Sequence, residues 1–214
     1  MKINDQKSND LLAVFIENLK SWHIVLFCEE PEHARVIEFQ FIRNGLEKGQ
    51  FCCYFTHENR EFIENEMADN EIDVACYTKN NMLRIIESID ILNDPLGVLA
   101  ASDAQTKKMC ANLSTAPFRI VGGISIRDTL NMINNSEIGD RLTRAQLKIE
   151  ENFHNQLFDG LKGYWLCSYQ VNDIKSALDG DSGNNNLIMA ELLKSHHGVV
   201  FATKSGKGIS LYLP

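Results

Sequence analysis

Residues 23–35 of the chain are His23-Ile-Val-Leu-Phe-Cys-Glu-Glu-Pro-Glu-His-Ala-Arg35, and they set the architecture of the segments around them. The run 23–28 is typical of a buried strand, because it is short, apolar and bounded by a turn. The amphipathic segment 34–48 predicts a helix, and the apolar run 51–56 predicts a second strand. A strand, a helix and a second strand in this order are typical of a parallel α/β sheet.

The turn after the first strand lacks the residues that bind a nucleotide phosphate. In a P-loop, glycines let backbone N–H groups close around the anion, while a lysine and a hydroxyl reach the phosphates and Mg²⁺. Residues 29–35 contain no glycine and no Gly-Lys-Ser/Thr, and they carry three carboxylates, Glu29, Glu30 and Glu32. We therefore predict a P-loop scaffold that has lost ATP binding and ATP hydrolysis.

The composition excludes several classes of protein. The chain has 214 residues, of which 44% are hydrophobic and 23% are charged, as in one globular domain with a sizeable core. Its net charge of −8 argues against a nucleic-acid-binding surface, which needs clustered lysines and arginines. No stretch is apolar enough to span a bilayer, and the polar N-terminus is unlike a signal peptide. We expect a cytoplasmic protein with no membrane or nucleic acid among its partners.

The six cysteines show no paired spacing. They are Cys28, Cys52, Cys53, Cys76, Cys110 and Cys167. Cys52 and Cys53 could form a redox pair, but adjacent residues on a strand point to opposite faces, so ordinary burial is expected. A zinc or iron site from Cys28, His33, His57 and a carboxylate is chemically possible, but no spacing indicates it. We predict six free thiols, no metal and no other cofactor.

The rest of the chain alternates short apolar runs with helical segments. Strands are expected at 72–74, 83–86, 118–121, 164–169 and 199–202, with a hairpin into a last strand at 209–213. Helices are expected at about 11–20, 59–70, 94–113, 140–158 and 186–195. This alternation predicts a mostly parallel sheet with helices on both faces. The expected organisation is a helical extension at 1–20, an α/β domain at 21–203 and a hairpin strand of the same domain at 204–214.

Short motifs occur in a particular order along the chain. A histidine opens the first strand, a Gly-Leu-x-x-Gly bend ends the helix at 34–48, a late strand contains Leu-Cys-x-Tyr, and a late helix finishes in histidine. Their residues are His23, Gly45, Gly49, Cys167, Tyr169 and His196. In this order and spacing the motifs resemble the MEDS family of sensory domains, named for methanogens and methylotrophs and for the dichloromethane-response regulator. The resemblance covers roughly residues 20–203.

The resemblance implies a degenerate RecA/KaiC-like fold and a role in signalling. Residues 40–58 also resemble the segment after the P-loop in KaiC-type ATPases, which carry an intact glycine-rich turn and a Walker B acid. The MEDS family is thought to bind small molecules derived from hydrocarbons, often beside a DNA-binding or kinase domain. We expect a stand-alone, non-catalytic sensory domain that binds a small ligand. The chain departs from the family at 122–124, where many relatives have a Gly-Glu pair.

The candidate binding site lies at the carboxyl ends of the predicted strands, where open parallel sheets bind ligands. Polar side chains would gather there from several strand ends and could hold a polar ligand or a metal. They are Glu29, Glu30, His33, Arg35, His57, Glu58, Ser125, Arg127, Asp128, Tyr169 and Gln170. The alternative is a solvated acidic rim. His23 opens its strand, so we expect it at the opposite edge of the sheet, in a structural hydrogen bond.

Two other functions remain open at this point. The chain could be an interaction module that regulates a KaiC-like ATPase, a kinase or a transcription regulator. It could also be a metal-assisted enzyme acting at the same strand ends. The charged helix expected at 140–158 and the edge of the last strand favour a homodimer, with a monomer as the alternative.

Overall fold

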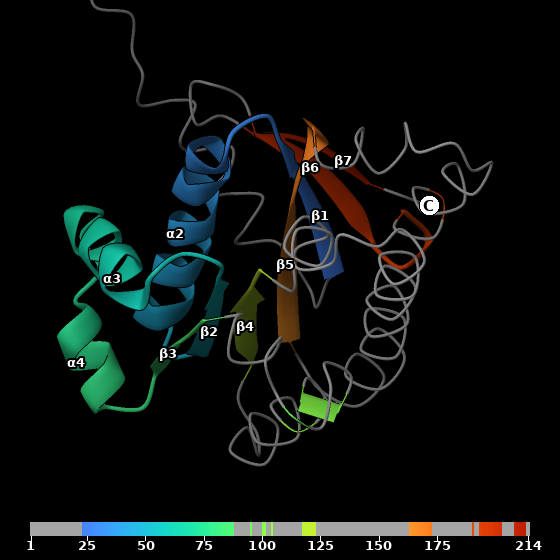
Figure 1. Cartoon of the computed structure of the whole chain (residues 1–214). Helices are drawn as coiled ribbons and strands as arrows, with labels where there is room; N and C mark the ends of the chain where they lie inside the picture. The colour runs from blue at the N-terminus through green and yellow to red at the C-terminus, as the bar shows by residue number, and fades with distance from the viewer. Residues whose placement is uncertain are drawn as a thin grey trace, which may run out of the picture.

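The structure of the chain is a computed structural model. It describes residues 23–87, 117–122, 163–172, 193–202 and the backbone of 208–212, together with Pro95, Ala100, Ala101, Ala104 and Ala190. These residues form a seven-stranded sheet with helices packed beside it (Figure 1). The elements are β1 (His23–Cys28), α2 (Pro31–Glu47), β2 (Phe51–Thr56), α3 (Arg60–Asp69), α4 (Val74–Lys79), β3 (Leu83–Glu87), β4 (Phe118–Val121), β5 (Gly163–Gln170), β6 (Gly198–Ala202) and β7 (Gly208–Tyr212).

The strands lie in the order β3-β2-β4-β5-β1-β6-β7, and all neighbours are parallel except β6 and β7. The mostly parallel sheet is therefore confirmed, as is the final antiparallel strand. The start of β1 meets two distant parts of the chain, because His23 pairs with Trp165 of β5 and Ile24 pairs with Gly198 of β6. This register places the amino end of β1 between the first half of β5 and the start of β6.

The strand β1 is buried on both faces of the sheet. Ile24, Leu26 and Cys28 of β1 belong to the main core with the apolar residues of α2. The alternate residues of β1, which include Val25, point to the opposite face, and they are buried too. The helix that covers the first face is α2, whereas α3 and α4 stand beside β3 (Figure 1). The helices expected at 11–20 and 140–158 lie outside the described residues, and those at 94–113 and 186–195 lie largely outside them.

One predicted strand is wrong. Residues 72–74 lead into α4, and the carboxylate of Asp73 caps that helix by accepting a hydrogen bond from the backbone N–H of Cys76 (3.0 Å). The Ile-Asp-Val alternation indicated a strand, but an aspartate is also a preferred N-cap residue, and here the helix prevails. The helix predicted at 34–48 begins earlier, at Pro31, which stands at its first position, where a missing N–H costs nothing.

No helix in the part of the chain that the structure describes is long and apolar enough to cross a membrane.

Candidate functional site

The turn between β1 and α2 has no phosphate cradle in the structure. Glu29 and Glu30 are exposed, and the side chain of Glu30 makes no cap hydrogen bond to the helix. A cradle of successive backbone N–H groups needs a residue in the left-handed region. Among the described residues, those with positive φ are Gly49, Glu71, Asn81 and Gly122, so this turn contains none. Three carboxylates therefore border a helix N-terminus that no anion-binding loop encloses.

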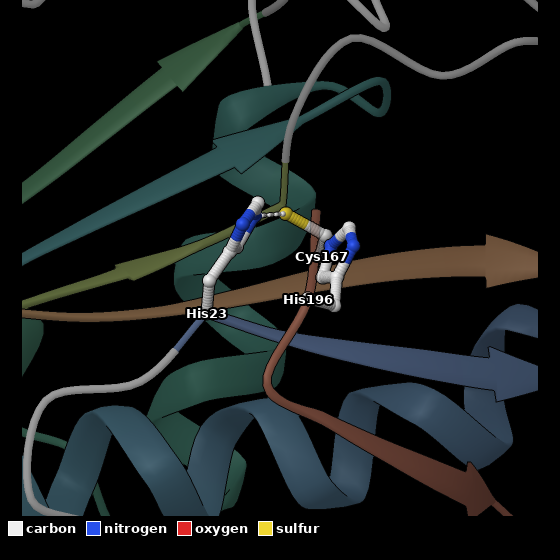
Figure 2. A group of neighbouring side chains, drawn as sticks. All are labelled: His23, Cys167 and His196. Carbon is white, nitrogen blue, oxygen red and sulfur yellow. Dashed lines mark hydrogen bonds between the residues drawn. The ribbon is translucent and has the colours of Figure 1, made fainter. Parts of the chain in front are cut away.

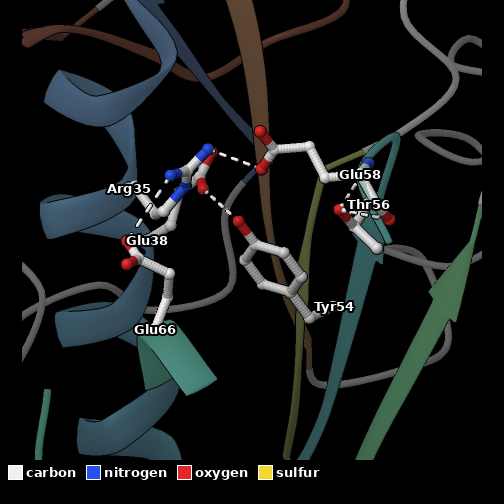
Figure 3. Close-up of polar contacts among 6 residues, drawn as sticks. All are labelled: Arg35, Glu38, Tyr54, Thr56, Glu58 and Glu66. Carbon is white, nitrogen blue, oxygen red and sulfur yellow. Dashed lines mark hydrogen bonds and ion pairs between the residues drawn. The ribbon is translucent and has the colours of Figure 1, made fainter. Parts of the chain in front are cut away.

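Arg35 is buried against acidic side chains. One guanidinium nitrogen lies 2.5 Å from Oε2 of Glu58, and another lies 3.5 Å from Oε2 of Glu66 (Figure 3). The guanidinium also lies over the ring of Phe62, 5.2 Å from its centroid. The sequence placed Arg35 and Glu58 in one ligand site, and the structure does bring them together. They neutralise each other and link α2 to the end of β2, so this cation is not available to a phosphate.

Glu38 is a buried carboxyl group that sequence reasoning missed. Its Oε2 accepts a hydrogen bond from Tyr54 Oη (2.6 Å; Figure 3), and its Oε1 accepts one from Ser168 Oγ. Burial raises the pKa of Glu38, while the two hydrogen bonds and the charge of Arg35 oppose that rise. A signal was present, because Glu38 lies four residues after the buried Ala34, on the inner face of α2.

The remaining predicted ligand residues do not form one group, because they differ in burial and in position. His57 is exposed after β2, whereas Tyr169 is buried in β5. The carboxyl ends of β1 and β5 are neighbours, because Cys28 pairs with Gln170. His33 lies in the first turn of α2, and its Nδ1 is buried with no hydrogen-bond partner among the described residues. Three further predicted residues, Ser125, Arg127 and Asp128, lie outside the described residues.

The metal site considered from Cys28, His33 and His57 is not formed. Sγ of Cys28 instead donates to the carbonyl oxygen of Tyr169 (3.6 Å). Within the described ranges, one group of three potential ligands comes together, and it consists of His23, Cys167 and His196. All three are residues of the family motifs, yet the sequence did not indicate that they meet.

The His23–Cys167–His196 cluster lies on the sheet face opposite α2, at the start of β1. Nε2 of His23 is 3.1 Å from Sγ of Cys167, and the rings of His23 and His196 stack with centroids 3.8 Å apart (Figure 2). One potential ligand atom of each residue lies within 4.8 Å of the others. The exposed fractions of the three residues are 0%, 2% and 4%. The cluster is therefore a compact set of nitrogen and sulfur donors inside the protein.

The segment before β6 orients both imidazoles. Nδ1 of His23 lies 2.8 Å from the carbonyl oxygen of Ser195, and Nδ1 of His196 lies 3.1 Å from Ser195 Oγ. A carbonyl oxygen only accepts, so His23 carries its proton on Nδ1 and turns the lone pair of Nε2 toward Cys167. The backbone N–H of His197 also donates to the carbonyl of His23 (2.7 Å). The structural hydrogen bond expected for His23 at this edge is thus confirmed.

The Gly-Leu-x-x-Gly bend packs against a second buried cation, Arg119. Arg119 of β4 is 1% exposed and donates to Gln50 Oε1 (2.7 Å), to the carbonyl of Phe41 (2.9 Å) and to Asn44 Oδ1 (2.8 Å). A Cβ added to Gly45 would lie 2.5 Å from Cδ of Arg119, so only glycine lets α2 approach so closely. Gly49 ends the bend with φ of +73°, a backbone conformation that glycine adopts without strain.

The two vicinal cysteines are buried on opposite faces, as expected. Cys52 belongs to the core beneath α2, and Cys53 lies on the other face. Burial raises the pKa of Cys52 to about 12 and that of Cys53 further still, so both remain thiols. The five described cysteines form no disulfide with one another, and Cys110 lies outside the described residues.

The chain is an α/β domain of RecA/KaiC-like fold, as its similarity to the solved structures below shows, and its turn 29–35 lacks a phosphate cradle. The chain belongs to the MEDS family, the methanogen/methylotroph, DcmR sensory domain, whose sequence model matches residues 22–196. A sensory role is therefore indicated by family membership. The search of curated proteins found no match to the chain.

Two solved structures from Pyrococcus horikoshii share the fold. A KaiC-like protein of this hyperthermophilic archaeon is 16% identical, with a TM-score of 0.56 over 85% of this chain and 71% of the other. An uncharacterised protein crystallised with an unknown peptide is 14% identical, with a TM-score of 0.61 over 97% of this chain and 89% of the other. At such identities the similarity defines the fold alone.

Proposed function

We propose that the chain is a sensory domain that binds a small molecule at the carboxyl edge of its sheet and does not hydrolyse ATP. The observation that carries this proposal is the turn 29–35, where the P-loop scaffold has exposed acids in place of a phosphate cradle. Arg35, the cation nearest this turn along α2, is already neutralised by Glu58 and Glu66. An anionic nucleotide therefore finds repulsion where a P-loop protein supplies attraction.

His33 supports a ligand at this edge. Its buried Nδ1 has no hydrogen-bond partner among the described residues, and such a group costs about 1–3 kcal/mol unless something satisfies it. A small neutral or cationic molecule with a hydroxyl, amine or amide group could do so, and the carboxylates of Glu29 and Glu30 favour it over an anion. The hydrocarbon-derived ligands expected for the family include small neutral molecules.

A thermal-shift screen of small alcohols, amines, amides and halogenated hydrocarbons tests the proposal. A ligand should raise the melting temperature of the wild-type chain, and His33→Ala should weaken its binding by about tenfold, the loss of one hydrogen bond. Glu47→Ala, an exposed acid at the other end of α2, is the matched control and should bind normally. A hit whose affinity survives His33→Ala and also Glu30→Ala would place the ligand elsewhere and reject this site.

A peptide-binding role is the second candidate. One structural neighbour was crystallised with an unknown peptide, and the sheet described here has β7 at one edge. An edge strand can pair with an extended peptide through its backbone groups. In this case the chain would act as an interaction module that regulates a KaiC-like ATPase or a kinase. ATPase assays of a KaiC-like protein from the same cell, with and without the chain, test this role, and an unchanged rate together with no complex on size exclusion excludes it for that partner.

A further inference from the structure

We propose that His23, Cys167 and His196 form a binding site for a divalent transition-metal ion such as Zn²⁺. The site lies at the amino end of β1 and on the face away from α2, so it is separate from the ligand site proposed above. It also differs from the sequence prediction, which included no metal. Two imidazoles and one thiolate are the donors that suit zinc and related ions, in preference to Mg²⁺ or Ca²⁺.

The distances match a coordination shell with small adjustments. Donor atoms about 2.0–2.3 Å from one tetrahedral ion lie roughly 3.5 Å from each other. Nε2 of His23 and Sγ of Cys167 are 3.1 Å apart, and all three potential ligand atoms lie within 4.8 Å of one another. Figure 2 shows the three side chains next to one another, from β1, from β5 and from the segment before β6.

The surrounding contacts are those of metal-binding histidines. Such a histidine usually donates its second ring N–H to a carbonyl or carboxylate, which fixes the ring and leaves the other nitrogen for the metal. His23 does this with the carbonyl oxygen of Ser195, and the hydroxyl of Ser195 contacts Nδ1 of His196. When the Ser195 hydroxyl accepts the hydrogen bond from Nδ1 of His196, Nε2 is the nitrogen through which each histidine would coordinate the ion. A simple thiol–imidazole hydrogen bond would account for His23 and Cys167 but would not require the stacked His196.

Binding would exchange a proton for the ion. The Cys167 thiol loses its proton to solvent as its sulfur bonds to the metal, so the affinity should rise with pH. No redox change is involved, since Zn²⁺ keeps its charge. Three protein ligands leave a fourth position for water or for a small molecule with a donor atom, as in zinc sites that act on ligands.

Titration of the metal-free, reduced chain with Co²⁺ tests the proposal, since Co²⁺ takes the same ligands and reports a thiolate through a charge-transfer band in the near ultraviolet. We expect one Co²⁺ per chain, a thiolate band, and displacement by Zn²⁺. Cys167→Ser should abolish the band, and His196→Gln should lower the affinity by roughly 100-fold. Ser195→Ala, which removes a positioning contact, should lower it by about tenfold.

Cys76→Ser is the matched control, because Cys76 is an exposed thiol that could bind the ion adventitiously. This variant should keep the full band and affinity. The proposal is overturned if the folded wild-type chain shows no thiolate band at saturating Co²⁺, or if Cys76→Ser loses the band and Cys167→Ser keeps it. The wild-type titration decides the question even if a cluster variant fails to fold.

Discussion

The two edges of the sheet use their polar residues in opposite ways. At the carboxyl edge, the acids of the first turn are exposed, and Arg35 is paired with acids. At the amino edge, His23, Arg119 and His196 are almost fully buried and held by defined hydrogen bonds. In a P-loop protein the carboxyl edge holds the phosphates and is the constrained one. In this chain the family-motif residues His23, Gly45 and Cys167 lie towards the amino edge.

The first way to test this contrast is to remove the most buried polar side chain of the amino edge. His23→Ala loses the hydrogen bond to the Ser195 carbonyl and the stacking on His196, and it leaves a cavity. We expect the free energy of unfolding to fall by about 2–4 kcal/mol in urea denaturation. His57→Ala, at the exposed carboxyl edge, is the comparison and should change it by less than about 0.5 kcal/mol. Equal losses of unfolding free energy in the two variants would contradict the difference between the two edges.

A second test targets the close contact between α2 and Arg119. In Gly45→Ala the new Cβ would lie 2.5 Å from Cδ of Arg119 and 2.8 Å from Sγ of Cys52, so the helix or the arginine must move. We expect a loss of about 1–3 kcal/mol in the free energy of unfolding. Adding Cys52→Ala should recover little, because the arginine contact remains. A stable Gly45→Ala variant would show that this edge is more adaptable than its packing indicates.

A third and smaller effect is expected at the carboxyl edge. Arg35→Met keeps much of the apolar stem but removes the ion pairs with Glu58 and Glu66, both partly exposed, so we expect a loss of about 1 kcal/mol. Arg43→Met, which breaks the exposed pair with Glu71, should cost less than about 0.5 kcal/mol. Chemical denaturation of the two variants side by side measures the difference. A loss of 3 kcal/mol or more at Arg35, about the cost of breaking a fully buried pair, would show that these ion pairs are stronger than their partial exposure indicates.

The smallest expected effect is a change in the pH dependence of the free energy of unfolding, and it concerns Glu38. Burial raises the pKa of this carboxyl above its ordinary value of 4.5, so the folded chain binds the proton more tightly than the unfolded chain. Its contribution to stability is full below the unfolded pKa and is lost as pH rises through the folded pKa. Glu38→Gln does not titrate, so its stability relative to wild type should rise from about pH 4.5 upward. A stability difference between Glu38→Gln and wild type that stays constant with pH would refute the shift.

The local pattern of apolar and turn residues was sufficient to predict most of the strands and helices that the structure describes. The strands at 23–28, 51–56 and 118–121 have the predicted limits, because each is a short apolar run bounded by turn residues. The strand proposed at 72–74 was wrong because Asp73 suits a helix cap as well as an alternating strand. The start of α2 at Pro31 could have been found from proline's preference for the first turn.

The candidate sites were harder to predict from the sequence than the fold. His23, Cys167 and His196 are far apart along the chain, and only the register of β1 against β5 and β6 brings them together. The sequence identified the three residues through the family motifs, but periodicity carries no information on which strands are neighbours. The charge of Arg35 made it a ligand candidate, whereas its pairing depends on Glu58 and Glu66, which lie after β2 and in α3.

The loss of the phosphate site is the central claim, and calorimetric titration of the chain with Mg-ATP tests it most directly. We predict no measurable heat of binding at millimolar nucleotide and no release of phosphate, because acids replace the cradle and Arg35 is neutralised. A glycine-rich KaiC-like ATPase titrated under the same conditions is the positive control. Stoichiometric binding of Mg-ATP with micromolar affinity would contradict the account.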